Sequence, residues 1–532
     1  MTSTTLTVSD HEAAEAPAEV RSGGPAPGGQ PPGGQPPGGM SSRTALGIFW
    51  FILQNLSSRA TAFLSQIVLA WLLSPADFGL IGLTYVVTNI VSQLVNFGVD
   101  DVLVQRQRHV RFWAGSALWV GLALGLLGGG IVMAAAPGMA ALYHAPRLVG
   151  LLAVLAISMP IGTLSTVPTV MLRAQLRFKF LAGYNAFELI AQQAFTIVLA
   201  WRGFGAYAFV IPVPIMAVVR VVVFWIVGRP PLRFRLHRAQ GGYLLRNGAA
   251  VFGSKLIVSA IGQGDYAILG VFASNATVGA YFFAFRLAAQ PVFVLAGNFS
   301  AVIYPVLTQF KADLRRQRDA ALRASRLLAH IVIPLSVIQA GMAAPLLHAF
   351  FGARWLAAIP LIQILSIGLA FDAPPWIAGA LLGSRGEFRR GFVYSCISLP
   401  VFFALVVTGT GTLGARGTAL AVAVYYLLYG PAYSYAVFRS DGVKFVAVLA
   451  LYLKPVLLSA AALAVGLVAA AGVGRIVSYD LVRAGVIGAV AALAYIPLSR
   501  LFAPDEFEEV AAKLRGVLSE RVPGLARTLR LA

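Results

Sequence analysis

Apolar segments of about twenty residues recur along the chain from Leu46 to Leu501, and short polar loops separate them. An α-helix of ~20 residues, rising about 1.5 Å per residue, crosses the ~30 Å hydrocarbon layer of a bilayer. The pattern predicts an all-α polytopic membrane protein of about fourteen transmembrane helices. The expected helices cover residues 46–73, 78–99, 113–136, 148–171, 181–201, 204–227, 247–272, 277–304, 327–351, 357–383, 391–410, 414–438, 447–471 and 480–501.

Composition supports this class. Of the 532 residues, 58% are hydrophobic and 11% are charged, whereas soluble domains carry about 25% charged residues. The single cysteine, Cys396, cannot form an internal disulfide, and the six histidines lack the spacing of a metal site. We expect no metal, no cofactor and no catalytic residue.

Basic residues collect in alternate loops. One set of loops is rich in arginine and lysine, and each loop of the other set holds at most one basic residue. The basic set comprises residues 106–111, 173–179, 229–246, 311–326, 385–390 and 439–444. Because basic loops stay in the cytoplasm, we expect both termini there. The net charge of +21 then reflects orientation in the membrane rather than binding of nucleic acid.

The loops also limit the function. Those opposite the basic set are too short to fold into a domain. This disfavours a membrane glycan polymerase or ligase, which needs a large external catalytic loop. The chain has no Gly-x-x-x-x-Gly-Lys-Ser/Thr run, so ATP hydrolysis within it is not expected. These features favour a transporter over an enzyme.

We divide the chain into five parts. Residues 1–42 are polar and rich in proline and glycine, which predicts a disordered cytoplasmic tail. Residues 43–245 form an N-terminal lobe of helices one to six, and 246–440 form a C-terminal lobe of helices seven to twelve. Residues 441–503 add two helices, and 504–532 form a cytoplasmic amphipathic tail.

An internal repeat relates the two lobes. The turn Ser74–Gly79 after the first helix and the turn Ser274–Gly279 after the seventh both read Ser-x-Ala-x-x-Gly. Helices one and seven run in the same direction, so the lobes are expected to be parallel repeats around a central cavity, as in many transporters. A general preference of short turns for serine, alanine and glycine is the alternative.

Polar stripes run along the first two helices. Asn55, Arg59 and Gln66 share a face of helix one, and Asn89 and Gln93 share a face of helix two. Lipid cannot satisfy such groups, so they should face a hydrated cavity or a tightly packed neighbour. Arg59 lies about 20 Å along its helix, near mid-membrane, where a guanidinium suits a phosphate.

The second half carries further polar candidates. Asp265 and Arg286 lie at similar depths on either side of the turn near Asn275 and form a second candidate pair. A structural salt bridge without substrate contact is the alternative. Lys255 and Gln263 precede Asp265 on the predicted helix 247–272. We assign Arg286, Lys255 and Gln263 to substrate binding. Snorkelling of Lys255 to the cytoplasmic surface and packing hydrogen bonds of Gln263 are the alternatives.

Two acidic residues are candidates for ion coupling. Asp265 is one, and Asp372 is the other, just before Pro374 and Pro375, which should break or kink their helix. Capping of that helix break is the alternative role of Asp372. Glu188 and Arg220 lie near helix ends, where each side chain can snorkel to the membrane surface.

Two motifs resemble those of a known family. The segment 69–80, LAWLLSPADFGL, resembles the pattern LARLLSPEDFG-L, and 97–106, FGVDDVLVQR, resembles DxGLxxALVQR. Both are similar to the polysaccharide transporter family of bacterial flippases, within the multidrug/oligosaccharidyl-lipid/polysaccharide exporter superfamily. Trp71 and Ala76 depart from the first pattern at a helix end. The resemblance extends over residues 43–440 and includes 172–178, LRAQLRF.

The resemblance implies a monomeric exporter in the bacterial cytoplasmic membrane. The implied cargo is an oligosaccharide on a polyprenyl pyrophosphate, moved by alternating access for surface polysaccharide biosynthesis. The implied partners are this glycan lipid, membrane lipids, and the glycan polymerase and glycosyltransferases of the pathway. A multidrug or small-molecule cation antiporter of the same superfamily is the alternative, although its cavity would be acidic.

Overall fold

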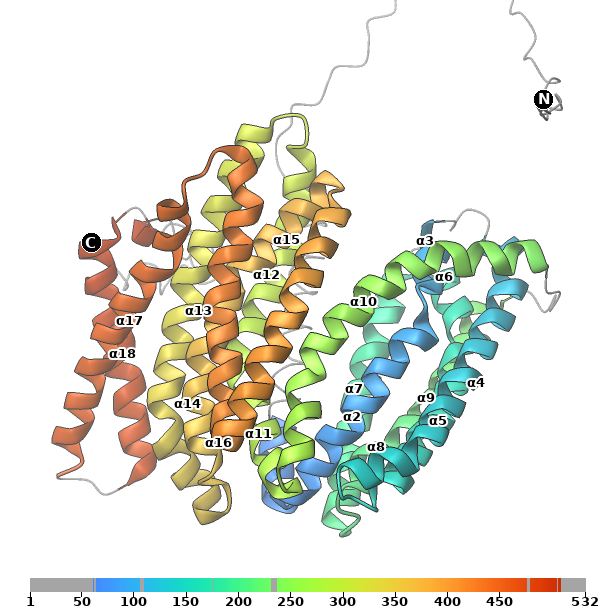
Figure 1. Ribbon diagram of the computed structural model, residues 1–532, viewed down its shortest axis with the longest axis horizontal. Helices are drawn as coiled ribbons and strands as arrows, with labels where there is room; N and C mark the ends of the chain where they lie inside the picture. Colours follow the sequence, from blue (N-terminus) through green and yellow to red (C-terminus); the bar gives the residue numbers. More distant parts are fainter. Residues whose placement is uncertain are drawn as a thin grey trace, which may run out of the picture. The chain divides into compact units, whose positions relative to one another are not determined.

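The computed structural model describes residues 61, 64–105, 110–175, 177–230, 237–475, 479–504 and 506–508. All of them lie in the larger of the two units into which the chain divides, Ile52–Ala532. Regular structure in this part of the chain is entirely helical (Figure 1). Residues 64–72 are helical. The following helices are α2 (Pro75–Asn96), α3 (Val99–Gln105), α4 (Val110–Leu142), α5 (Leu148–Thr163), α6 (Thr166–Ala174), α7 (Phe178–Trp201), α8 (Tyr207–Val210), α9 (Pro212–Gly228), α10 (Arg238–Phe272), α11 (Asn275–Ala288), α12 (Gln290–Gln309), α13 (Leu314–Phe351), η2 (Gly352–Trp355), α14 (Ala358–Leu369), η3 (Ala370–Asp372), α15 (Ala373–Arg385), α16 (Phe388–Phe438), η4 (Arg439–Asp441), α17 (Phe445–Val473) and α18 (Asp480–Phe502).

Ten helices in the described residues are long and apolar enough to cross a membrane, or eleven if α5 and α6 form one bent span. The predicted number of fourteen is therefore not confirmed. The first predicted helix, 46–73, lies largely outside the described residues. Helix α16 is one of the ten, although it joins two predicted spans, which we call its two arms, at a kink at Gly414. The φ of 58° at this residue suits glycine, which has no Cβ.

Several predicted spans are divided into two helices. Helix α5 meets α6 at an angle of 41°. The predicted helix 277–304 is divided into α11 and α12 at Ala289, and 357–383 is divided into α14 and α15 by the 3₁₀ turn η3. The prediction that Pro374 and Pro375 break their helix is confirmed, because both prolines lie in the first turn of α15.

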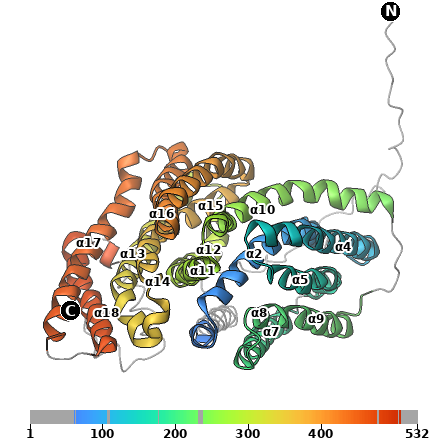
Figure 2. The ribbon, with the colours of Figure 1, turned by 60° about the horizontal axis from the view of Figure 1, so that its bottom comes forward.

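Helix α10 is longer than predicted and contacts both halves of the chain (Figure 2). Its first turns pack on the first half, where the ring of Phe252 stacks on Phe97 at a centroid distance of 4.9 Å. Further along, Gly264 lets α10 approach Phe402 and Phe403 of α16 closely. The expected lobe boundary at 245–246 therefore falls inside one continuous helix.

The last two helices pack on each other and on α13 (Figure 1). Gly466 of α17 faces the backbone of α18, and Gly488 of α18 faces Met342 of α13. Small residues allow helices to approach closely in a membrane, where packing rather than hydrophobic burial favours association. The two C-terminal helices therefore extend the second half of the chain.

Candidate functional site

The two predicted repeat turns start helices α2 and α11 in the same way. The Ser74 hydroxyl accepts a hydrogen bond from the Asp77 amide at 3.2 Å, and the Ser274 hydroxyl accepts one from the Thr277 amide at 3.4 Å. A serine side chain satisfies an amide at a helix start that otherwise lacks a partner. The shared motif is thus a shared N-cap.

Helices α2 and α11 then pack against each other reciprocally. A Cβ at Gly79 would collide with the carbonyl oxygen of Asn275, and a Cβ at Gly279 would collide with the carbonyl oxygen of Pro75. Residues 75 and 275 are equivalent in the repeat, as are 79 and 279. The contact is therefore two-fold symmetric and requires glycine on both sides.

Loop residues extend this contact. The indole nitrogen of Trp355, in η2, donates to the carbonyl of Ala70 at 3.1 Å, and Arg354 donates to the carbonyl of Trp71 at 3.1 Å. The Trp71 indole donates in return to the carbonyl of Phe350 at 2.7 Å. The acceptors at Ala70 and Trp71 lie in the last turn of their helix, where carbonyls lack intrahelical donors.

The symmetry includes the aromatic rings. Trp355 is 1% exposed and follows α13, and Tyr143 is 4% exposed and follows α4. Tyr143 lies against Gly270, the repeat equivalent of Ala70, with ring atoms 2.9 Å from the position of a Cβ. We call this set of contacts the interlock: Ala70, Trp71, Gly79, Tyr143, Gly270, Gly279, Arg354 and Trp355. It joins the two halves at the ends of α2 and α11 that begin with the repeat turns.

Arg286 lies in the last turn of α11, next to the helix break at Ala289. Its guanidinium is 5.4 Å from the centre of the Phe282 ring, a cation–π distance, and it interacts electrostatically with Tyr85 of α2 and Tyr266 of α10. No carboxylate of the described residues lies within 4.0 Å of it. A positive charge is thus held inside the bundle beside the negative end of a helix dipole.

The break beside Arg286 has a specific cause. Pro291 lacks an amide hydrogen, so the carbonyl of Leu287 loses its helical donor. The Gln339 side chain of α13 replaces that donor at 2.7 Å. Discontinuous helices near mid-membrane mark substrate and ion sites in many transporters. Gln339 was not among the predicted polar residues, although Pro291 was a readable sign of the break.

Asp265 is buried, with 2% of its surface exposed. Its carboxylate accepts hydrogen bonds from the Tyr281 hydroxyl at 2.8 Å and from the Tyr266 amide at 2.9 Å. It forms no ion pair with Arg286 within 4.0 Å, so the structural salt bridge that was the sequence-based alternative is absent. Tyr281 of α11 is the partner that sequence reasoning missed.

Asp372 lies at the second helix break, in η3. Its carboxylate accepts a hydrogen bond from the Trp376 indole at 2.9 Å. No basic residue of the described chain lies within ion-pair distance of Asp372 or Asp265. The Tyr426 side chain of α16 is within electrostatic range of both carboxylates. The two acidic candidates therefore belong to one region of the second half.

Some of the remaining predicted residues are described by the structure and others are not. Gln66 is buried, and its amide nitrogen has no hydrogen-bond partner among the described residues. Gln93 donates to the carbonyl of Asn89 in its own helix at 3.3 Å. Gln263 is partly exposed and Lys255 is exposed, both on α10. Arg59 and Asn55 lie outside the described residues.

Part of the polar stripe on α2 is satisfied within the helix. The Thr84 hydroxyl donates to the Leu80 carbonyl at 2.6 Å, and the Thr88 hydroxyl donates to the Thr84 carbonyl at 2.9 Å. Ser92 donates to the carbonyl of Asn89 at 2.8 Å. Hydroxyls on a helix can bond to a carbonyl three or four residues earlier. The hydroxyls of the stripe and the Gln93 amide nitrogen are thus satisfied inside α2, and within the described residues the Asn89 side chain is the group left for a ligand.

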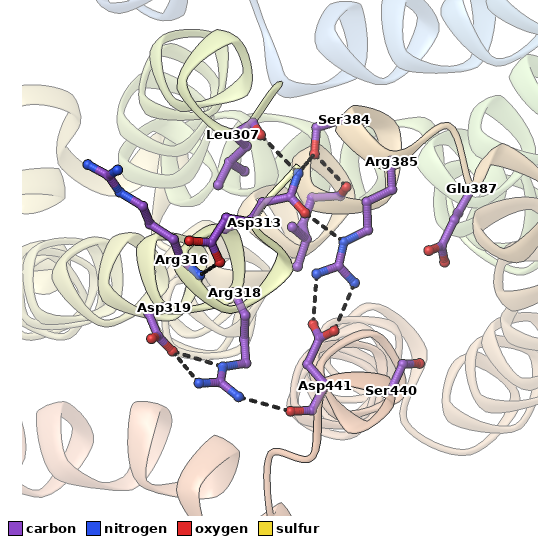
Figure 3. Close-up of polar contacts among 12 residues, drawn as sticks. Leu307, Asp313, Arg316, Arg318, Asp319, Ser384, Arg385, Glu387, Ser440 and Asp441 are labelled. Carbon is purple, nitrogen blue, oxygen red and sulfur yellow. Dashed lines mark hydrogen bonds and ion pairs between the residues drawn. The ribbon is translucent and has the colours of Figure 1, made fainter. Parts of the chain in front are cut away.

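Two ion pairs link helices outside the predicted sites. Glu188 and Arg220, which the sequence placed near helix ends, form an ion pair between α7 and α9 at 3.4 Å. In the second half, Arg385 of α15 makes a bidentate pair with Asp441 of η4 at 3.0 and 3.1 Å, and both side chains are largely buried. Figure 3 shows this network, in which Arg385 also donates to Gln317 of α13. It connects the basic-loop ends of three helices.

Comparison with known proteins gives a consistent set of relatives. A family model described as polysaccharide biosynthesis protein matches residues 68–360. The succinoglycan biosynthesis transport protein ExoT of Rhizobium meliloti (strain 1021) is 24% identical over 419 residues, covering 77% of this chain and 83% of ExoT. The lipopolysaccharide biosynthesis protein WzxC of Escherichia coli (strain K12) is 20% identical over 383 residues, covering 72% of this chain and 78% of WzxC.

Solved structures share the fold. The lipid II flippase MurJ in an inward closed conformation has a TM-score of 0.67 at 15% identity, covering 86% of this chain and 99% of the MurJ chain. An inward-facing multidrug resistance MATE family transporter of the MOP superfamily has a TM-score of 0.59 at 17% identity, covering 75% of this chain and 98% of the transporter. These likenesses show the architecture of the described helices.

Proposed function

Because this chain belongs to the polysaccharide biosynthesis protein family, we propose that it moves a lipid-linked oligosaccharide across the bacterial cytoplasmic membrane for surface polysaccharide biosynthesis. It is a multi-pass membrane protein. The proposed cargo is a glycan on a polyprenyl pyrophosphate, and the proposed mechanism is alternating access. Chemistry on the sugar is left to other proteins, since the family and its relatives are named for transport and biosynthesis.

Arg286 is the observation that carries the proposal. A guanidinium inside a membrane helix is costly and marks a functional site by default. Here it lacks a carboxylate partner among the described residues and lies beside a helix break. A pyrophosphate supplies the missing negative charge and accepts two parallel hydrogen bonds from one guanidinium. We assign Arg286 to the head group, together with Arg59 and Lys255.

Neutral amides suit the sugar. Gln66 has a buried amide nitrogen without a partner in the part of the chain that the structure describes, and such a group costs free energy until it is hydrogen-bonded. Gln66, Asn89, Gln93, Gln263 and Asn55 are the proposed contacts to glycan hydroxyls. The lipid tail stays in the bilayer, so the site handles only the head group.

Asp265 and Asp372 are proposed to couple transport to a proton or a cation. Within the described residues, the hydrogen-bond donors to each carboxylate are all neutral, and a buried negative charge without a counter-charge is strongly unfavourable. Binding of a proton or a cation removes that cost. An inside-negative potential also assists outward movement of an anion by about 2.3 kcal/mol per charge at 100 mV.

The interlock defines the direction of opening. We place the repeat turns at the outer face and the basic loops in the cytoplasm, with both termini inside. The interlock then closes the outer end between α2 and α11. Release of cargo to the outside requires these contacts to separate, whereas the cytoplasmic end receives the substrate first.

The test is translocation of a fluorescent lipid-linked glycan in liposomes that contain the purified protein. Arg286→Gln should reduce translocation at least tenfold, and Arg286→Lys should retain part of it, because a point charge replaces the bidentate donor. Arg202→Gln, at an exposed loop residue, is the matched control. Normal translocation by a folded Arg286→Gln variant would refute the assignment. Arg59→Ala should likewise abolish surface glycan while the protein stays inserted.

A further inference from the structure

A groove of about 260 Å³ lies between the two arms of α16. Its floor is aromatic: Tyr425, Tyr429 and Tyr433 follow each other at helical spacing, with stacked rings 5.2 and 5.3 Å apart. Its mouth is aliphatic, since Ile397 and Leu428 are 62% and 56% exposed. A long apolar side chain or acyl chain fits such a groove, whereas a sugar does not.

One end of the groove is strongly basic. Tyr394 and Ala436 line this end, and the Tyr394 hydroxyl donates to the Ala436 carbonyl at 3.3 Å. Arg390 ties the same end together, because it donates to the Tyr394 hydroxyl at 3.2 Å and to the Ser440 hydroxyl at 2.7 Å. The two arms of α16 thus meet where the apolar groove reaches its polar boundary.

The charges at this boundary are mainly positive. Arg389 and Arg439 are both exposed, and they directly precede Arg390 and Ser440 in the sequence. Glu387 and Asp441 are the neighbouring carboxylates, and they are already paired with Arg390 and Arg385. Two arginines therefore remain on the surface at the level where the apolar lining ends. Basic pockets between membrane helices on the cytoplasmic side bind anionic lipid head groups.

We propose that this groove binds an anionic phospholipid, with an acyl chain along the tyrosines and the phosphate between Arg389 and Arg439. All lining residues come from α16, so the site belongs to the second half alone. It is distinct from the proposed cargo site at Arg286 of α11, and it does not depend on the transport proposal. The lipid comes from the leaflet that faces the basic loops.

Native mass spectrometry of the full chain in detergent tests the site, with phosphatidylglycerol, phosphatidylcholine and polyprenyl phosphate added separately. Ala432→Trp fills the groove, and the double variant Arg389→Gln/Arg439→Gln removes the head-group charges. Leu457→Trp, at an exposed position of α17, and Arg475→Gln, in an opposite loop, are the matched controls. Melting temperatures without lipid identify variants that fail to fold, and Leu428→Trp replaces Ala432→Trp in that case.

We expect phosphatidylglycerol to bind more tightly than phosphatidylcholine. The double arginine variant should weaken it about 25-fold, at roughly fivefold for each arginine near an anionic head group. Ala432→Trp should abolish the bound lipid, and the controls should retain it. Equal binding of both phospholipids, or retention of phosphatidylglycerol by Ala432→Trp, would overturn the proposal. Preference for polyprenyl phosphate would overturn it as well and reassign the groove to the cargo tail.

Discussion

The reciprocal glycines of the interlock allow a direct test of alternating access. Alanine at Gly79 would place its Cβ against the carbonyl of Asn275 and 3.1 Å from the Gly279 amide nitrogen. Both of these neighbours are backbone atoms, which cannot move aside as a flexible side chain can. The clash exists only while α2 and α11 touch, so Gly79→Ala should destabilise the closed interlock rather than the fold of either helix.

The size of the effect follows from a matched control. Gly130 and Gly138 of α4 have open space around the position of a Cβ. Alanine at any of these positions gains up to about 1 kcal/mol of helix propensity. The difference between Gly79→Ala and Gly130→Ala therefore isolates the overlap, which typically costs 1–3 kcal/mol. A value of about 2 kcal/mol shifts the closed–open equilibrium about 30-fold.

Thiol accessibility measures this shift. Ala70, which is 1% exposed at the interlock, is replaced by cysteine in a Cys396→Ser background and labelled with a membrane-impermeant maleimide. Labelling should be slow with Gly79 in place and about 30-fold faster with Gly79→Ala. Gly279→Ala should give the same increase, because the contact is reciprocal. Labelling of Gly79→Ala at the Gly130→Ala rate would refute the reasoning.

Two further predictions concern charges near the basic-loop ends. Asp441→Ala should lower the free energy of unfolding by about 3–5 kcal/mol, because it leaves the buried Arg385 guanidinium unpaired. Chemical denaturation measures this loss. The double variant Asp441→Ala/Arg385→Leu should recover most of it. Glu506 follows α18. Burial alone would raise the pKa of its carboxyl group, but a backbone hydrogen bond and the basic residues Lys454, His330 and Arg326 lower that pKa below its ordinary value. A lowered folded-state pKa stabilises the protein above the ordinary glutamate pKa of about 4.3, and this contribution disappears as the pH falls through the folded-state pKa. The melting temperature of the native protein should therefore fall more steeply below pH 5 than that of Glu506→Gln, and parallel curves would contradict this.

Local chemistry made much of the fold predictable. Apolar length and basic loops indicated membrane helices, and the Ser-x-Ala-x-x-Gly turns predicted two equivalent helix starts because an N-cap depends on a few adjacent residues. Pro374 and Pro375 predicted a break for a similarly local reason. Pro291 carried the same information, but the surrounding apolar run led to a single predicted span from 277 to 304. The start of α10 at Arg238 was missed because its first turns are polar.

The site was predictable only in part, because it depends on contacts between distant residues. Equal depth suggested that Asp265 and Arg286 form a pair, but depth does not fix which side chains face each other. The carboxylate of Asp265 is taken by Tyr281, whose hydroxyl reaches it at 2.8 Å. Similarly, the motif containing Gly79 was visible, whereas its contact with Asn275, almost two hundred residues away, depends on how α2 and α11 pack.

The symmetry of the interlock has a consequence for how it opens. Separation of α2 from α11 breaks the Gly79 and Gly279 contacts together, because each glycine packs on the helix that carries the other. The loop contacts are not equal, however. Trp355 donates a hydrogen bond to Ala70, whereas the Tyr143 ring makes van der Waals contact with Gly270, and within the described residues its hydroxyl forms no hydrogen bond. A hydrogen bond contributes about 1 kcal/mol beyond packing, so the Trp355 side holds more of the closing energy, and opening is easiest to begin at the Tyr143 side.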